Sequence, residues 1–89
     1  MILRRTDYIL DSTTFGWKKT KEHILKEDDN INNLIVFGED HMKRSIEIFR
    51  AKQYSDITKK GKMGSKTVEL VFRTTQGRMR IYRYDIIPS

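Results

Sequence analysis

Apolar and polar residues alternate with a period of two in the last third of the chain. Val68, Leu70 and Phe72 fall at every second position of residues 66–73, which is typical of a strand with one buried face. Residues 54–59 also have strand-forming composition and precede a glycine-containing loop. We therefore expect these two segments to pair as a hairpin.

A second alternating segment, residues 78–86, follows the turn at residues 74–77. Met79 and Ile81 share one side of this strand, which we expect to face the core. The other side is then exposed and carries guanidinium and phenol groups: Arg78, Arg80, Tyr82 and Tyr84. The three segments together predict an antiparallel three-stranded meander.

The first half of the chain has a less regular pattern. Residues 2–10 have strand-forming composition, and residues 11–14 provide N-cap candidates for a helix in which Trp17, Lys21, Ile24 and Leu25 recur at near-helical spacing. Residues 33–37 form a short apolar run that predicts a buried strand.

The clearest helical pattern comes next, over residues 41–53. Met42, Ile46 and Phe49 recur at i, i+4 and i+7, and Asp40 is a good N-cap. The pattern as a whole predicts an α+β fold: an antiparallel sheet of 3–5 strands with two helices packed on one face. A single domain over residues 1–89 is expected, since linkers and repeats are absent from the sequence. We expect the large residues Phe15, Trp17 and Phe37 to lie in its core.

Composition narrows the chemistry. The chain has no cysteine and two separated histidines, so we expect no disulfide, no metal, no cofactor and no catalytic residues. His23 and His41 each stand beside an acid but lack a recognisable nucleophile, so a non-enzymatic protein is expected. No apolar run is long enough for a signal or a membrane span, and we expect a cytoplasmic protein without membrane contact.

Positive charge is concentrated in the second half of the chain. Residues 50–89 hold ten Lys and Arg against three acids, whereas residues 1–49 hold eight against nine. The whole chain has a formal charge of +6. A folded surface of one sign attracts polyanions, and nucleic acid is the commonest of these in a cell.

Two segments are candidates for this surface: the lysine-rich loop near residues 59–66 and the last strand. Both can hold phosphates, and tyrosine rings can stack on unpaired bases. The loop can equally be an ordinary hydrated loop, and the strand can be a dimer surface or a structural face. The glycines of the loop lack the spacing of a nucleotide-binding P-loop. The predicted nucleic-acid-binding residues are Lys59, Lys60, Lys62, Lys66, Arg73, Arg78, Arg80, Tyr82, Arg83 and Tyr84.

About thirty residues resemble a known family. The stretch from Phe37-Gly38 through Met42, Ile46, Phe49, Ser55 and Lys60 resembles the strand–helix–strand portion of the double-wing domain in the middle-transcription activator of T-even phages. That resemblance implies a sheet-based DNA-binding domain. In size, charge and lack of cysteine, the chain is also similar to small early proteins of such phages, which include an RNA-binding inhibitor of a toxin–antitoxin ribonuclease.

The sequence thus predicts a small basic protein, expected as a homodimer, that binds RNA by occupancy without catalysis. If it is phage-encoded, its compartment is the host cytoplasm and inhibition of a host toxin ribonuclease is an expected role. Single- or double-stranded DNA remains an alternative ligand, with a double-wing transcription regulator as the corresponding function. Docking on an acidic host protein is the third alternative.

Overall fold

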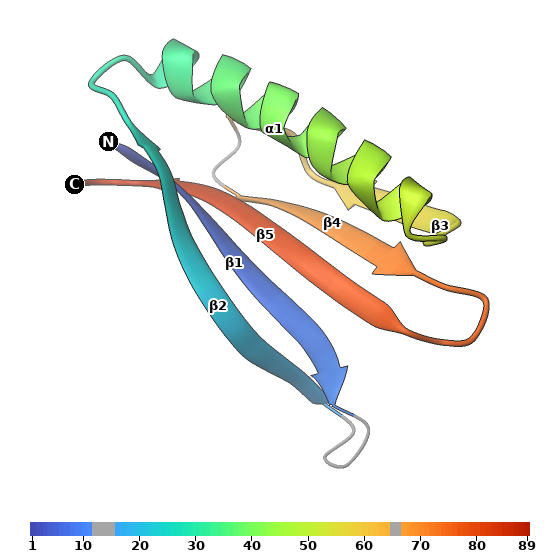
Figure 1. The fold of residues 1–89 in the computed structure, drawn as a ribbon. Coiled ribbons are helices and arrows are strands. Elements are labelled where there is room, and N and C mark those ends of the chain that lie inside the picture. Colours follow the sequence, from blue (N-terminus) through green and yellow to red (C-terminus); the bar gives the residue numbers. More distant parts are fainter. Residues whose placement is uncertain (12–15, 65–66) are drawn as a thin grey trace.

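The computed structural model describes residues 1–11, 16–64 and 67–89. Within these residues the chain forms five strands and one helix (Figure 1). The elements are β1 (Ile2–Asp11), β2 (Gly16–Glu27), α1 (Ile31–Ala51), β3 (Asp56–Lys60), β4 (Thr67–Arg73) and β5 (Met79–Ile87). The strands form an antiparallel sheet in the order β2-β1-β5-β4-β3. Strand β1 therefore joins the N-terminal hairpin to the C-terminal meander.

The helix lies across one face of the sheet, which we call the helix face (Figure 1). Leu34, Met42 and Phe49 are buried on α1 and pack with the buried side chains of β4. The Phe49 ring stacks on Phe72 with centroids 3.9 Å apart and ring planes 12° from parallel. The alternation of Val68, Leu70 and Phe72 predicted a strand with one buried face, and these three side chains are buried in the core.

The opposite face of the sheet, the open face, is not covered by α1. Residues directly opposed in an antiparallel pair project from the same face. Leu70 opposes Tyr82, and Val71 opposes Ile81, so Tyr82 lies on the helix face and Ile81 on the open face. The prediction that Met79 and Ile81 face the core is wrong, because the pattern gave the alternation but not the side that the helix covers.

The predicted pair of helices is wrong as well. Residues 16–27, expected to contain the first helix, form the edge strand β2. The β1–β2 pairing has two register shifts, one of which separates Trp17 and Lys19 from Glu22 and Ile24. These four residues oppose alternate residues of β1, so they lie on one face of the sheet. Because of the shift, this face includes both Trp17 and Ile24, although they are seven positions apart in the sequence. A separation of seven is also typical of two residues on one side of a helix. Trp17 is 41% exposed, so it is not a core residue.

The predicted strand at residues 33–37 is the first part of α1. Asn30 caps this helix, with its side-chain oxygen accepting from the amide of Asn32. The apolar run continues at helical spacing through Leu34, Gly38 and Met42, all buried. The segment that resembles the double-wing domain therefore has helix where the resemblance implied its first strand, whereas the second strand is present as β3. Asp40 lies inside the helix instead of capping it. The predicted cap residues 12–14 and Phe15 lie outside the described residues.

Candidate nucleic-acid interface

The ten predicted binding residues do not form one surface. By register, Lys59, Arg80, Tyr82 and Tyr84 lie on the helix face, and Lys60, Arg73 and Arg83 lie on the open face. Arg78 precedes β5 in the hairpin, Lys62 lies in the loop after β3, and Lys66 is outside the described residues. The expected convergence of the basic C-terminal half into one cationic surface is therefore not what the fold produces.

Tyr84 is a core residue. Its side chain is 0% exposed, and its hydroxyl oxygen lies 2.9 Å from His41 Nδ1 and 3.1 Å from Ser45 Oγ. Burial raises the pKa of this phenol to about 12, so the hydroxyl keeps its proton at neutral pH. Because a phenol has one proton, Tyr84 can donate to only one of its two partners. The ring cannot stack on a ligand base from beneath the helix.

Tyr82 is also turned toward the helix. Its ring meets Phe49 edge-on at 5.2 Å, and the guanidinium of Arg5 lies 4.1 Å from the ring centroid on β1. Burial raises the pKa of Tyr82. Both tyrosines of the last strand therefore support the core, and the predicted outward row of rings on β5 is absent from the described structure.

Acidic residues lie beside two of the predicted cations. Lys59 Nζ is paired with Glu39 Oε2 on α1 at 3.2 Å. Arg73 Nη1 is only loosely paired with Asp56 Oδ2 on the neighbouring strand β3, at 3.9 Å. Lys60 differs, because it has no carboxylate partner within residues 1–11, 16–64 and 67–89. Lys59 and Lys60 are adjacent in sequence but project from opposite faces, and the second is available to a ligand.

A hollow of about 250 Å³ lies on the open face. Every strand of the sheet contributes to its lining, which consists of Tyr8, Trp17, Lys60, Glu69, Ile81 and Arg83. The register explains how these residues meet: Tyr8 opposes Ile81, while Arg83 opposes Glu69. Glu69 in turn opposes Lys60 on β3. The hollow thus brings together two aromatic rings and two cations from both ends of the sequence.

Arg83 lines this hollow from the central strand β5, and its pairing is incomplete. Its guanidinium carbon lies 5.4 Å from the centre of the Tyr8 ring, and its Nη2 is 3.8 Å from Glu69 Oε1, too long for a hydrogen bond. Its Nε is buried without a hydrogen-bond partner among the described residues. A buried donor left unpaired costs about 1–3 kcal/mol. A ligand that lets Arg83 turn and satisfy this donor recovers part of that free energy.

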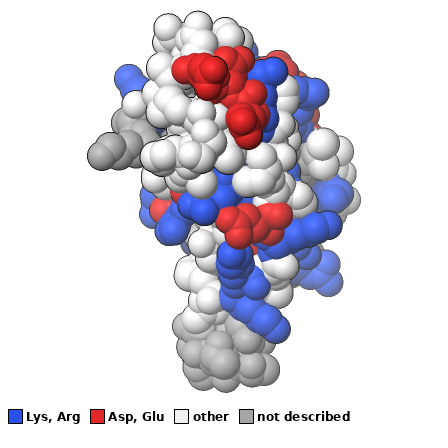
Figure 2. All heavy atoms as spheres, turned by 90° about the vertical axis from the view of Figure 1, so that its left-hand side faces the viewer, with Lys and Arg blue, Asp and Glu red and all other residues white. Residues whose placement is uncertain are grey.

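The rest of the open face is close to neutral. Arg4 Nη2 is 2.7 Å from Asp85 Oδ2, and its Nη1 is 3.1 Å from Glu22 Oε1. Glu22 also accepts from Lys19 Nζ at 3.0 Å, and that hydrogen bond lowers the pKa of Glu22. Outside the open face, at the end of the molecule that carries both termini, basic and acidic side chains are interspersed as well (Figure 2). Ligand attraction on the open face therefore depends on the hollow and not on a broad positive field.

Of the residues that line the hollow, Lys60 and Arg83 are among the predicted binding residues, whereas the rings of Tyr8 and Trp17 are not. Trp17 was predicted to lie in a helix and to face the protein core, and Tyr8 was part of a predicted strand without clear alternation. One signal was available: Trp17 is followed by Lys18, Lys19 and Lys21, an aromatic residue beside cations in a segment with few other large apolar residues.

Other site types find less support. Within residues 1–11, 16–64 and 67–89, no group of three His, Asp or Glu side chains is placed to hold a metal ion. Among the same residues, no helix has both the length and the apolar character needed to cross a membrane. Comparison with protein-family models, with curated proteins and with solved structures found no match to this chain.

Proposed function

We propose that this protein binds single-stranded nucleic acid, with RNA as the expected ligand, in the open-face hollow, and that it acts by occupancy without chemistry. The observation that carries the proposal is the placement of the exposed Trp17 ring beside Tyr8, Arg83 and Lys60 in one depression. Exposed rings on an open antiparallel sheet can stack on unpaired bases, and neighbouring cations can hold the phosphates.

Stacking favours an unpaired strand over a duplex. A duplex buries the faces of its bases, so the Trp17 and Tyr8 rings would have nothing to stack on. Stacking of a base on an aromatic side chain is worth about 1–3 kcal/mol. One such contact corresponds to about a 5- to 150-fold change in affinity. The rings therefore supply more of the expected binding free energy than the few unpaired cations do.

Arg83 and Lys60 are proposed to contact phosphates. Lys60 has no carboxylate partner within the described ranges, and Arg83 Nη2 is only loosely paired with Glu69 at 3.8 Å. A phosphate oxygen can accept stronger, charge-assisted hydrogen bonds from a guanidinium than Glu69 accepts at that distance. Such contacts position a strand but do not read its sequence. A protein bound in this way would shield RNA from a ribonuclease by covering it.

The chain contains one tryptophan, so fluorescence gives a direct test. Titration with single-stranded RNA is expected to quench Trp17 emission as a base stacks on the indole. Trp17→Ala is expected to weaken binding, measured by fluorescence anisotropy of labelled RNA, by about tenfold or more. Ile24→Ala is the matched control, because Ile24 is an exposed apolar residue of β2 that does not line the hollow. Binding without quenching, or equal losses in both variants, would remove the hollow from the interface.

The adjacent lysines provide the second control. Lys60→Gln is expected to reduce the magnitude of the slope of log affinity against log salt by about 0.7, the value for one phosphate contact on a single strand. Lys59→Gln changes the same charge but on the helix face, where Lys59 is paired with Glu39, and its slope is expected to equal that of the wild type. Equal slopes in the two variants would contradict phosphate contact by Lys60.

A protein partner is the second candidate, favoured by the near-neutral charge of the open face. Cores of protein interfaces are depleted of charge and enriched in Tyr, Trp and Arg. The same titration separates the two candidates: a protein-docking face would leave Trp17 emission unchanged by RNA, single-stranded DNA and duplex DNA alike. Quenching by both single strands but not by the duplex would support the first proposal. The expected homodimer stays a prediction, which light scattering can test.

A further inference from the structure

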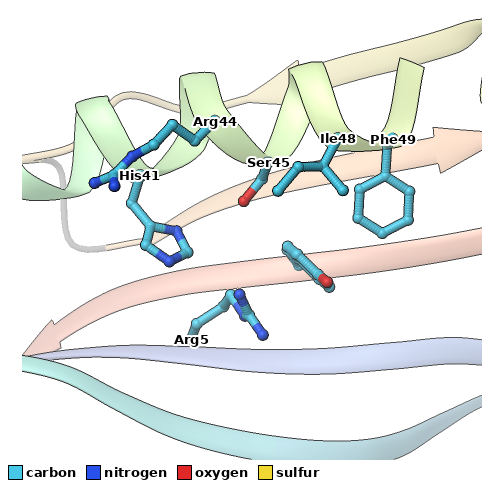
Figure 3. A pocket seen from close by; sticks show the side chains of 7 residues that line it. Arg5, His41, Arg44, Ser45, Ile48 and Phe49 are labelled. Carbon is cyan, nitrogen blue, oxygen red and sulfur yellow. The ribbon is translucent and has the colours of Figure 1, made fainter. Parts of the chain in front are cut away.

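A second depression, of about 210 Å³, lies on the helix face between α1 and the sheet (Figure 3). His41, Ser45 and Phe49 point from α1 toward the sheet, and Arg5 extends from β1 toward them (Figure 3). Tyr82 forms part of the lining together with Arg44 and Ile48. The depression is separated from the open-face hollow by the sheet itself, because the two lie on opposite faces.

Two guanidinium groups line this depression. Arg5 donates from Nε and Nη2 to the carboxylate of Asp7, at 2.8 and 3.0 Å, which fixes its plane over the Tyr82 ring. Arg44 lies on the rim with a more exposed side chain, and its Nη2 is 2.8 Å from Asp40 Oδ2. That pair is exposed, and exposed pairs of this kind are weak. Arg44 can therefore turn from Asp40 to an anion in the depression at little cost, while Arg5 stays in place.

Two neutral polar side chains, His41 and Ser45, add one donor between them, because Tyr84 can donate to only one of the two. His41 Nδ1 is held by the Tyr84 hydroxyl, so the ring plane is set and Nε2 is left without a hydrogen-bond partner among the described residues. Burial, together with the positive charges of Arg5 and Arg44, lowers the pKa of His41. Ser45 contributes a hydroxyl that is itself held by Tyr84.

From this arrangement we propose that the depression between α1 and β1 binds the phosphate group of a phosphomonoester. A phosphate in the depression can accept from the guanidinium of Arg5 and, once Arg44 turns from Asp40, from a second guanidinium. The volume exceeds that of several water molecules, each of which occupies about 30 Å³ in the liquid. Ile48, which is 53% exposed, lines the same depression and offers an apolar contact to the organic part of the ester. The ligand is a free nucleoside monophosphate or the 5′-phosphate end of a nucleic acid, which share this chemistry.

The two histidines allow a direct test by NMR. Inorganic phosphate is added at constant pH and constant ionic strength, with sodium chloride as the reference salt. The ring resonances of His41 are expected to shift saturably, and those of His23, which is bound to Asp7 outside the depression, are expected to shift less. Absence of a saturable His41 shift, or equal shifts of both rings, would overturn the proposal.

Variants on the helix test the role of charge. Arg44→Gln is expected to weaken phosphate binding by about tenfold or more, since one charge-assisted contact is lost. Arg50→Gln removes the same charge from an exposed position of α1 that does not line the depression, and its affinity is expected to stay within about twofold of the wild type. Equal weakening in both variants would mean a diffuse attraction and refute a built site.

The source of the phosphate is resolved with three probes. Adenosine monophosphate and a 5′-phosphorylated RNA dinucleotide are each expected to reproduce the His41 shift, and the 5′-hydroxyl dinucleotide is not. Failure of both phosphorylated probes while inorganic phosphate binds would refute the phosphomonoester assignment. Binding by the monophosphate alone assigns the depression to a small ligand; binding by the dinucleotide as well assigns it to chain ends. The proposal does not rest on RNA binding at the open face, because Trp17→Ala is expected to leave the His41 response unchanged.

Discussion

Tyr84→Phe tests the face assignment on which both sites depend. The change removes one hydroxyl from a fully buried side chain and leaves the ring in place, so no large cavity forms. It removes the bonds to His41 at 2.9 Å and to Ser45 at 3.1 Å. Ser45 is 5% exposed and loses this hydroxyl partner. The free energy of unfolding is therefore expected to fall by about 1–3 kcal/mol.

A loss of that size is easy to measure in a domain of 89 residues. Each kcal/mol corresponds to about 4–8 °C in melting temperature for domains of 60–100 residues. Thermal and urea unfolding followed by circular dichroism measure the loss, and an unchanged urea m-value shows that the folded state stays equally compact. Because Tyr84 is under the helix, the RNA affinity of the folded variant at low temperature is expected to match that of the wild type.

Tyr8→Phe is the matched control, since Tyr8 lines the open-face hollow and its hydroxyl is not part of the core network. Its stability is expected to change by less than about 0.5 kcal/mol. The opposite pattern would refute the reasoning. If Tyr84→Phe melted like the wild type and lost RNA affinity, Tyr84 would face the ligand, and the assignment of the helix face and the open face would be reversed.

Three further predictions concern the core, pH and the ion pairs. Phe49→Ala removes the ring stacked on Phe72 and is expected to cost about 3–5 kcal/mol in urea unfolding; a fully stable variant would contradict the packing of α1. Because the pKa of His41 is lowered on folding, the unfolded chain takes up a proton first, so stability is expected to fall as pH drops from about 7.5 to 5.5, less steeply in a His41→Gln variant; equal slopes would refute this. Asp85→Asn leaves Arg4 without its partner at 2.7 Å and is expected to cost about 1 kcal/mol, a loss that high salt would reduce; a salt-independent loss would indicate a packing effect instead.

Alternation in the sequence predicted the strands of the C-terminal meander but not which face is covered. Residues 79–84 alternate as expected, and β5 begins at Met79. Both sets of side chains on that strand suit a sheet: Met79 and Ile81 are apolar, whereas Tyr82 and Tyr84 combine large rings with hydroxyls. The position of α1 determines which set is buried, because His41 and Ser45 on this helix hydrogen-bond with the Tyr84 hydroxyl. Local periodicity cannot indicate a hydrogen-bond partner that lies about forty residues away in the sequence.

The two errors in the first half have local causes. The register shift inside β2 brings Trp17 and Ile24 to one face at a spacing that a helix would also give. The apolar run at residues 33–37 is short enough to be either a buried strand or one turn of a buried helix. Gly38 follows this run directly, so the sequence did not show that the helix continues through it. The first error also explains why the hollow was not predicted, because Trp17 reaches the open face only if residues 16–27 are a strand. Lys60 and Arg83 could be predicted as cations, but their neighbours could not.

The arrangement of the strands also decides how strongly salt should affect binding. The sequence has its excess charge in residues 50–89, but β5 is inserted between β1 and β4, so the two halves are interleaved in space. Arg4 consequently pairs with Asp85, and Lys59 pairs with Glu39, each across the boundary between the halves. An excess of positive charge in one half of the sequence gives a positive surface only when the fold keeps that half apart from the other half.

The cations left for RNA in the hollow are therefore few. With Lys60 and Arg83 as the two phosphate contacts, the slope of log affinity against log salt is expected to be about −1.4 for a single strand. The eight cations among the ten predicted residues, acting together, would give a slope of about −5.6. Anisotropy titrations between about 50 and 200 mM salt separate these values. A steep slope would show that phosphate contacts extend well beyond the hollow, and that stacking on Trp17 and Tyr8 is not the main source of affinity.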